Sequence, residues 1–172
     1  MDKEFHHIEA RIRKRFHKAC ADYALIEDGD HILVGLSGGK DSLALVELLG
    51  KRSKIYVPRF RVTALHVRMR EINYESDVAY LEQFCKEFGV ELIVREASIN
   101  ADYTKESGAD DRAGKAEKSH CFLCSWYRRK MLFDVAQELG CNKIALGHHM
   151  DDILITLLMN MTFLGQFSSM AP

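Results

Sequence analysis

The sequence predicts an α/β fold: a parallel twisted sheet with helices on both faces, preceded by an N-terminal helix. Short apolar runs, each long enough for one strand, alternate with segments in which apolar residues recur every three or four positions. Glycines follow two of the helical segments, where left-handed helix ends favour them. Strands that alternate with helices are typical of parallel sheets, whose ligands bind at the carboxyl ends of the strands.

The first segment of the chain is expected to form an amphipathic helix of its own. Apolar residues recur at spacings of three and four from Phe5 to Tyr23, and the turn residues Asp28-Gly29-Asp30 end the segment. We therefore divide the chain into an N-terminal helix, residues 1–27, and an α/β domain, residues 28–172.

The α/β domain contains four predicted strands and four predicted helices. The strands cover residues 31–36, 61–67, 90–94 and 143–146, and the helices cover 41–49, 76–88, 124–139 and a last stretch from Asp151 or Asp152 to Leu164. Gly89 and Gly140 close the second and third of these helices. Residues 97–120 have few large apolar groups, and a loop this long in a compact domain is usually functional or disordered.

The composition is that of a soluble globular protein, and we expect the protein to be cytoplasmic because the sequence predicts neither a signal peptide nor a membrane span. The 172 residues are 47% hydrophobic and carry a net charge of -1, so a nucleic-acid site would have to be a local patch. The N-terminus is too charged for a signal peptide, and the longest apolar stretch, residues 153–164, is too short to span a membrane. The five cysteines, an odd number in a reducing compartment, argue against a disulfide framework.

The turn after the first strand is a candidate phosphate-binding loop, with the sequence Ser37-Gly38-Gly39-Lys40-Asp41-Ser42. Two glycines allow a tight turn and close approach of the backbone to a ligand, and the following helix start presents free N–H groups to an anion. Lys40 adds a positive charge, and the two serines add hydroxyl donors. Neither a Walker A motif nor G-x-G-x-x-G is present. An ordinary strand-to-helix turn is the alternative.

A second polar loop, Gly147-His148-His149-Met150-Asp151-Asp152, follows the fourth strand. Its two carboxylates suit Mg²⁺, which binds through few protein carboxylates together with phosphate oxygens. The imidazoles could donate to a phosphate or hold a carboxylate. The alternative is that an aspartate merely caps the last helix.

The pair Cys121 and Cys124 lies where the polar loop meets a helix, a position that favours thiolate. A lone C-x-x-C is consistent with packing, redox chemistry or metal binding. Cys20, Cys85 and Cys141 are expected to be packing residues. The sequence contains two basic clusters. One covers residues 11–18, and the other lies near the cysteine pair. Either cluster could bind RNA phosphates, and the alternative is a solvated helix face. The second cluster comprises Lys115, Lys118, Arg128, Arg129 and Lys130, with Trp126 and Tyr127 as base-stacking or core residues.

The motif Ser-Gly-Gly-x-Asp-Ser after a first strand resembles the signature of the PP-loop ATP pyrophosphatases. The resemblance implies an adenine-nucleotide alpha-hydrolase-like, Rossmann-like fold and an enzyme that cleaves ATP to AMP and pyrophosphate. It implies that residues 37–42 grip the pyrophosphate and that the end of the second strand, Leu65, His66 and Val67, contributes to the adenosine pocket. A strand-end histidine without a ligand role is the alternative for His66.

The Gly-His-His-x-Asp-Asp element, the C-x-x-C pair and the following Arg128-Arg129 resemble the tRNA 2-thiocytidine synthetase branch of that family. In this branch the two cysteines, with a third further downstream, ligate an iron–sulfur cluster, which the resemblance implies to be of the 4Fe–4S type. The chain holds no later cysteine at a suitable position, and the fold's fifth strand is missing. We therefore expect a protein truncated at its C-terminus.

The resemblance to this branch implies an ATP-dependent enzyme that adenylates a tRNA cytidine and inserts sulfur. Lys40, Asp41, Cys121 and Cys124 are the expected catalytic residues. The nucleotide is expected to bind residues 37–42, His66, Gly147 and His148, with Mg²⁺ on Asp41, Asp151 and Asp152. The expected partners are tRNA, a sulfur-donor protein or sulfide, and a second copy in a homodimer. The alternatives are a lysidine synthetase-like ligase, a nucleotide-binding module without turnover and a zinc-stabilised RNA-binding piece.

Overall fold

The computed structural model describes residues 3–70, 77–99 and 120–170, and it confirms the predicted α/β fold. The helices are α1 Lys3–Asp22, α2 Lys40–Ser53, α3 Val78–Phe88, α5 His120–Leu139 and α6 Met150–Met159, with the π-helical turn η1 Asn160–Leu164. The strands are β1 His31–Gly35, β2 Arg61–Met69, β3 Glu91–Ala97 and β4 Lys143–Ala145. Each predicted strand is present within a few residues of its predicted bounds.

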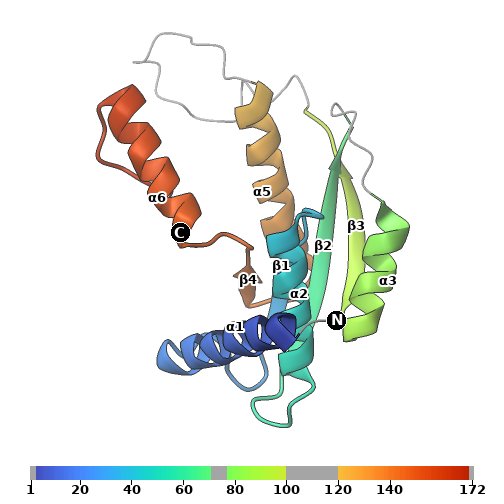
Figure 1. The fold of residues 1–172 in the computed structure, drawn as a ribbon. Helices are drawn as coiled ribbons and strands as arrows, with labels where there is room; N and C mark the ends of the chain where they lie inside the picture. The colour runs from blue at the N-terminus through green and yellow to red at the C-terminus, as the bar shows by residue number, and fades with distance from the viewer. Residues whose placement is uncertain (1–2, 71–76, 100–119, 171–172) are drawn as a thin grey trace.

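The four strands form one parallel sheet in the order β3-β2-β1-β4. In Figure 1 the strands run upward, with α2 and α3 on one face and α5 on the other. The register pairs Gly35 at the end of β1 with Leu65, so β2 continues past β1 and pairs Met69 with Ala97 of β3. The loops after β1 and β4 therefore leave the sheet at the same edge, as expected for ligand-binding loops of a parallel sheet.

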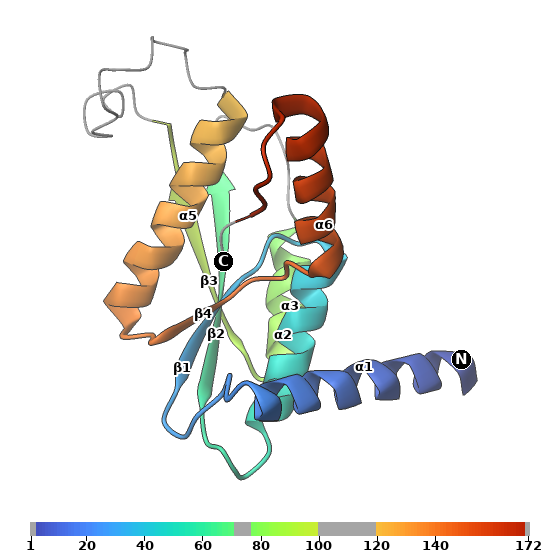
Figure 2. The same cartoon turned by 90° about the vertical axis from the view of Figure 1, so that its left-hand side faces the viewer.

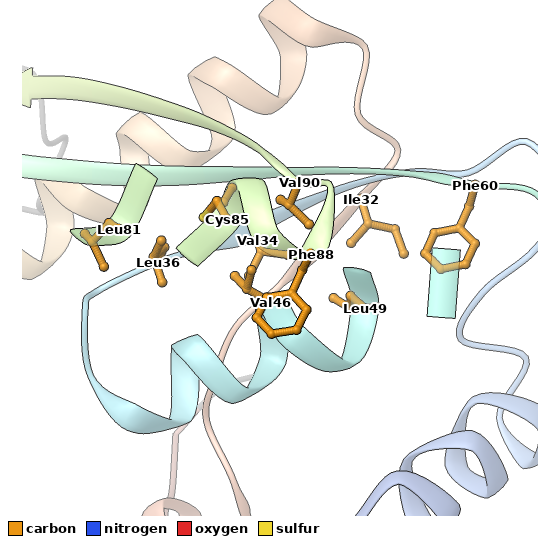
Figure 3. Packing of buried hydrophobic residues seen from close by; sticks show 11 residues of the cluster. Ile32, Val34, Leu36, Val46, Leu49, Phe60, Leu81, Cys85, Phe88 and Val90 are labelled. Carbon is orange, nitrogen blue, oxygen red and sulfur yellow. The ribbon is translucent and has the colours of Figure 1, made fainter. Parts of the chain in front are cut away.

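Alternating residues of β1 supply both halves of the core. Ile32 and Val34 face α2 and α3, where they pack with Val46 and Phe88, as Figure 3 shows. Leu33 faces the other way, toward Val135 of α5. Side chains alternate across a strand, so a central parallel strand covered by helices on both faces is apolar throughout.

The helix ends follow the glycine signals in the sequence. Gly89 ends α3 with φ 74°, and Val90 N–H donates to Cys85 O at 2.9 Å. Gly140 ends α5 in the same way, with φ 65° and Cys141 N–H donating to Ala136 O at 2.8 Å. Both are left-handed caps that satisfy carbonyls of the last helical turn.

At the amino ends of the strands, a buried carboxylate connects the start of β1 to the start of β4. Asp30, only 3% exposed, accepts hydrogen bonds from Asn142 Nδ2 at 2.7 Å and from Glu27 N–H at 2.6 Å. Lys143 Nζ lies 2.7 Å from the same carboxylate. Burial alone would raise the pKa of Asp30, but the hydrogen bonds from Lys143, the Glu27 N–H and Asn142 outweigh it and hold the pKa below its usual value. This network joins the starts of β1 and β4.

Several element boundaries differ from the predictions. β2 runs to Met69 rather than residue 67, and β3 runs to Ala97 rather than residue 94. α5 begins at His120, four residues before the predicted start, because nothing between His120 and Cys124 breaks a helix. α2 continues to Ser53. The last helix changes to a π-helical turn after Met159, where the Thr162 hydroxyl donates to Leu158 O at 2.8 Å, a back-bond that bends helices.

Two helices extend from the body of the domain in Figures 1 and 2. α1 meets the lower end of α2 and projects away from it, and α6 stands apart from the sheet. Within the described residues no helix is long and apolar enough to cross a membrane. Most of the predicted loop over residues 97–120 lies outside the described residues.

Candidate nucleotide-binding site

The phosphate loop follows β1 and Leu36, whose backbone N–H and C=O groups are both hydrogen-bonded to residues of β2. Leu36 N–H donates to Leu65 O at 2.9 Å, and His66 Nδ1–H donates to Leu36 O at 2.7 Å. His66 is 5% exposed, so its imidazole is part of the packed sheet edge. The second-strand histidine singled out in the sequence thus lies directly behind the loop, where it fixes the residue from which the loop departs.

Inside the loop, two serine hydroxyls hold the backbone turn. Ser42 Oγ donates to Gly39 O at 2.9 Å and accepts from Ser37 N–H at 3.2 Å. A hydroxyl has one proton, so Ser37 Oγ–H must be the donor in the 3.1 Å contact between the two hydroxyls. Gly39 N–H in turn lies 3.3 Å from Ser37 Oγ. The turn is therefore shaped by its own hydroxyls.

The glycines give the loop its path and leave the start of α2 open. Gly38 has φ 88°, a left-handed value that a side chain would strain. Gly39 is the N-cap of α2, and among the described residues no side chain caps this helix start. The first N–H groups of a helix have no partner within the helix and carry the positive end of its dipole. Lys40 and Asp41, both exposed, begin the helix beside these donors.

The second loop lies directly against the first. A Cβ atom added to Gly147 would lie 2.9 Å from Ser42 N, 3.0 Å from Asp41 C and 3.2 Å from Ser42 Cα. Only a glycine can bring its backbone this close to the first turn of α2. The start of α6 accordingly lies beside the start of α2 in Figure 2. The two motifs, more than a hundred residues apart in sequence, therefore lie side by side and make up one candidate site.

Inside this site, His149 lies between carboxylates of the two loops. Its Nε2 is 4.0 Å from Asp41 Oδ2, and its Nδ1 is 3.6 Å from Asp152 Oδ2. Asp152 also accepts from His149 N–H at 2.8 Å, so this aspartate caps α6, the alternative that the sequence had left open. Asp151 and His148 are exposed on the same loop.

A metal ion at this site would depend on ligands from the nucleotide. Among residues 3–70, 77–99 and 120–170, no group of three or more His, Cys, Asp or Glu side chains could hold a metal by itself. Mg²⁺ in nucleotide sites is typically held by one or two carboxylates plus phosphate oxygens and water. Asp41 fits that role because it is exposed at the helix start, whereas Asp152 is already engaged in capping.

The cysteine pair lies in the first two turns of α5, at the same edge of the sheet. Cys124 is 5% exposed and packs with Met69 and Ala97, the last residues of β2 and β3. The side chain of Cys121 lies outside the described residues. With one described thiol at this edge, the described residues do not form the ligand set of an iron–sulfur cluster.

The remaining cysteines are packing residues, as expected. Cys85 is fully buried under the sheet, and burial raises the pKa of its thiol to about 11. Burial also raises the pKa of Cys20 and of Cys141, which packs against the core at the opposite edge of the sheet. A thiol that resists ionisation is a poor metal ligand or nucleophile.

The second basic cluster is only partly described. Arg128, Arg129 and Lys130 are exposed on α5, whereas Lys115 and Lys118 lie outside the described residues. Trp126 and Tyr127 are half-buried and meet edge to face at 5.2 Å between ring centroids. Neither ring is presented as an open stacking platform.

The sequence reasoning expected the imidazoles to donate to a phosphate or hold a carboxylate, but only His148 was named as a nucleotide-binding residue. The structure places His149 beside the carboxylates of Asp41 and Asp152. The close approach of Gly147 to α2 was missed. A glycine directly after a strand that ends at a ligand-binding edge is the signal that could have indicated it.

Comparisons with known proteins agree with this geometry. Residues 6–170 match the PP-loop domain family. The tRNA-cytidine(32) 2-sulfurtransferase of Ralstonia pickettii is 39% identical over 168 residues, which are 98% of this chain and 50% of that protein. The protein of the same name from Geotalea daltonii is 36% identical over 162 residues, 94% of this chain and 61% of that protein. The chain thus spans about half to three fifths of these relatives.

A solved structure shares the fold. The U34-tRNA thiolase NcsA from Methanococcus maripaludis, determined with its 4Fe–4S cluster, superposes with a TM-score of 0.71 and 27% sequence identity. The match covers 93% of this chain and 52% of the thiolase.

Proposed function

The chain belongs to the PP-loop domain family, and we propose that it is the nucleotide-binding part of an ATP-dependent tRNA-thiolating enzyme whose target is a cytidine. One observation supports this most: the backbone of Gly147 is packed on Asp41 and Ser42, which joins the phosphate loop and the His-His-x-Asp-Asp loop into one site. Relatives that match 98% and 94% of this chain are named tRNA-cytidine(32) 2-sulfurtransferase.

In the proposed first step, the site activates the base. The pyrophosphate of ATP lies on residues 37–42, where the N–H groups at the start of α2 and Lys40 bind its charge. The carbonyl oxygen at C2 of cytidine attacks the α-phosphorus, the bond from that phosphorus to the bridging oxygen breaks, and pyrophosphate leaves. Mg²⁺ held by Asp41 and the exposed Asp151 would neutralise charge on the leaving group, while Asp152 caps α6. His66 keeps the loop in place, and His148 and Gly147 border the nucleotide.

In the proposed second step, sulfur replaces the activated oxygen. A donor protein that carries a persulfide transfers its terminal, sulfane-level sulfur to one thiolate of the pair Cys121 and Cys124, and the donor leaves as a thiolate. The terminal sulfur attacks C2 and AMP leaves with the former base oxygen. The other thiolate then breaks the sulfur–sulfur bond, which releases the 2-thiolated base and leaves a cysteine disulfide. An external dithiol reductant restores the pair.

Pyrophosphate release tests the proposal. The protein is incubated with ATP, Mg²⁺ and an unmodified tRNA transcript that carries cytidine at position 32, and pyrophosphate is measured by a coupled assay. Wild-type protein should release pyrophosphate only when this tRNA is present. Lys40→Ala and Asp41→Asn should lower the rate by about 10²-fold or more, as expected when charge stabilisation of the transition state is removed.

Other outcomes separate the alternatives. Nucleotide binding without any pyrophosphate release would identify a binding module without turnover. Release that requires lysine and ends in a lysine adduct of the tRNA would identify a ligase of the lysidine synthetase type. A bound zinc ion with no nucleotide binding would leave only an RNA-binding role.

A further inference from the structure

The outer face of α1 carries a stripe of positive charge. Arg11, Lys14, Arg15 and Lys18 follow the spacing i, i+3, i+4, i+7, which places them on one face of a helix. All four are exposed. Lys18 pairs with Asp22, whereas Arg11, Lys14 and Arg15 make no ion pair or hydrogen bond with the described residues. These four residues are termed the basic stripe.

The opposite face of the helix is the one that docks. Phe16 packs against the core beneath α2, and Cys20 is buried. Glu9, on the same side, forms a 2.9 Å ion pair with Lys51 at the far end of α2. The stripe is therefore held at a fixed orientation, pointing away from the domain.

The charge is concentrated on this element. Residues 3–22 contain six lysines and arginines against three acidic residues, while the whole chain has a net charge of -1. His17, at the docked side, has its pKa lowered by burial and by the nearby Arg52 and Arg13, so it is neutral and adds nothing to the positive charge of the helix. A local positive field of this kind on a nearly neutral protein fits a polyanion rather than a small anion.

We infer that the basic stripe of α1 binds the phosphate backbone of the tRNA at a distance from the nucleotide site. α2 separates the two surfaces: it starts at the phosphate loop and its other end contacts α1, and a helix of this length spans about 20 Å. An RNA the size of tRNA is large enough to reach both. The inference rests on the proposed function, because it names a second contact of the same substrate.

A membrane surface is the competing partner, and the docking of α1 argues against it. A basic helix that binds lipid inserts its apolar face. Here Phe16 and Cys20 on that face are packed against the protein, which leaves Ile8 and Ile12, 42% and 49% exposed, beside them. Two partly exposed isoleucines offer little apolar surface for insertion into a membrane.

Salt-dependent tRNA binding tests the inference. The triple variant Arg11→Gln, Lys14→Gln, Arg15→Gln keeps helix propensity, and a thermal melt followed by circular dichroism checks its fold. Affinity for an unmodified tRNA transcript is measured from about 50 to 300 mM KCl, because each lost phosphate contact lowers the salt slope by about 0.7 to 0.9. The slope should fall by about 2 to 3, with affinity at least tenfold weaker at the lower salt. The matched control removes three positive charges elsewhere, at Lys54, Lys86 and Arg95, and should change the slope by less than half as much.

Every other result overturns the inference. An unchanged slope, an equal loss in the control, or absence of tRNA binding by the wild type would each do so. Loss of binding to phosphatidylserine vesicles with tRNA binding intact would assign the stripe to a membrane instead. Pyrophosphate release is measured in parallel. If the wild type releases pyrophosphate with tRNA while the slope is unchanged, the stripe inference fails and the proposed function stands. If the wild type releases no pyrophosphate with tRNA, the proposed function fails, whatever the salt slope shows.

Discussion

Replacing Gly147 by alanine should uncouple the two loops of the nucleotide site. The added Cβ would lie 2.9 Å from Ser42 N and 3.0 Å from Asp41 C, whereas ordinary contacts begin near 3.4 Å. The atoms it meets belong to helix backbone, which cannot rotate away as a side chain can. The loop after β4 must therefore withdraw from α2 by about half an ångström, and overpacking of this kind costs about 1–3 kcal/mol.

The consequence for catalysis should exceed the consequence for stability. For a domain of this size, about 1–3 kcal/mol lowers Tm by roughly 2–12 °C. A displacement of reacting groups of up to about 1 Å can slow a reaction by about 10²-fold. We expect pyrophosphate release per folded molecule to fall at least tenfold, measured by the coupled assay at a temperature well below the Tm of the variant.

Gly50→Ala is the matched control. Its Cβ would lie 2.8 Å from Phe88 Cβ and 3.0 Å from Phe88 O, so the crowding is similar but lies near the other end of α2, away from the site. It should lower Tm to a comparable extent and leave pyrophosphate release per folded molecule unchanged. If the two variants lose the same activity per folded molecule, the close approach of the loops has no catalytic importance and the reasoning is refuted.

Three further changes test parts of the structure. Asp152→Ala should lower the free energy of unfolding by about 1 kcal/mol, because α6 loses its cap. Asp151→Ala, the control, should change it little. Equal effects of the two variants in urea unfolding would contradict the capping role of Asp152. Because the pKa of Asp30 is lowered in the fold, its contribution to the free energy of unfolding is complete above its unfolded pKa near 4 and is lost as pH falls through the lower folded pKa. Asp30→Asn should therefore reduce the loss of stability at acid pH, measured by urea unfolding from about pH 2 to 7. An unchanged acid dependence would contradict the stabilising role of the Asp30 carboxylate. His66→Phe should lower the free energy of unfolding by about 1–3 kcal/mol, because Leu36 O loses a buried hydrogen-bond donor. It should also weaken ATP binding in a fluorescence titration. If neither stability nor ATP binding changes, His66 does not support the loop.

Much of the fold could be read from the sequence because each signal is local. The apolar run from Ile32 to Val34 is continuous because β1 is covered on both faces, and Gly89 and Gly140 adopt the left-handed conformation that their positions indicated. The boundaries were less certain because periodicity fades at helix ends. Thus α5 starts at His120 rather than Cys124.

The internal arrangement of the site could be predicted only in part. Both loops were expected at one edge of the sheet, because parallel strands end there together. The position of His149 between Asp41 and Asp152 depends on how tightly the loops pack, which no spacing in either loop encodes. The roles of Lys40, Asp41, Cys121 and Cys124 stay predictions, since they concern ligands and chemistry.

Nucleoside mass spectrometry of tRNA tests the central claim most directly. The gene that encodes this chain is deleted, total tRNA is digested, and 2-thiocytidine is quantified against the parent strain and a strain complemented with the intact gene. We predict selective loss of 2-thiocytidine and its return on complementation. Retention of 2-thiocytidine at the parental level would contradict thiolation, and loss of lysidine in its place would assign the site to the ligase chemistry.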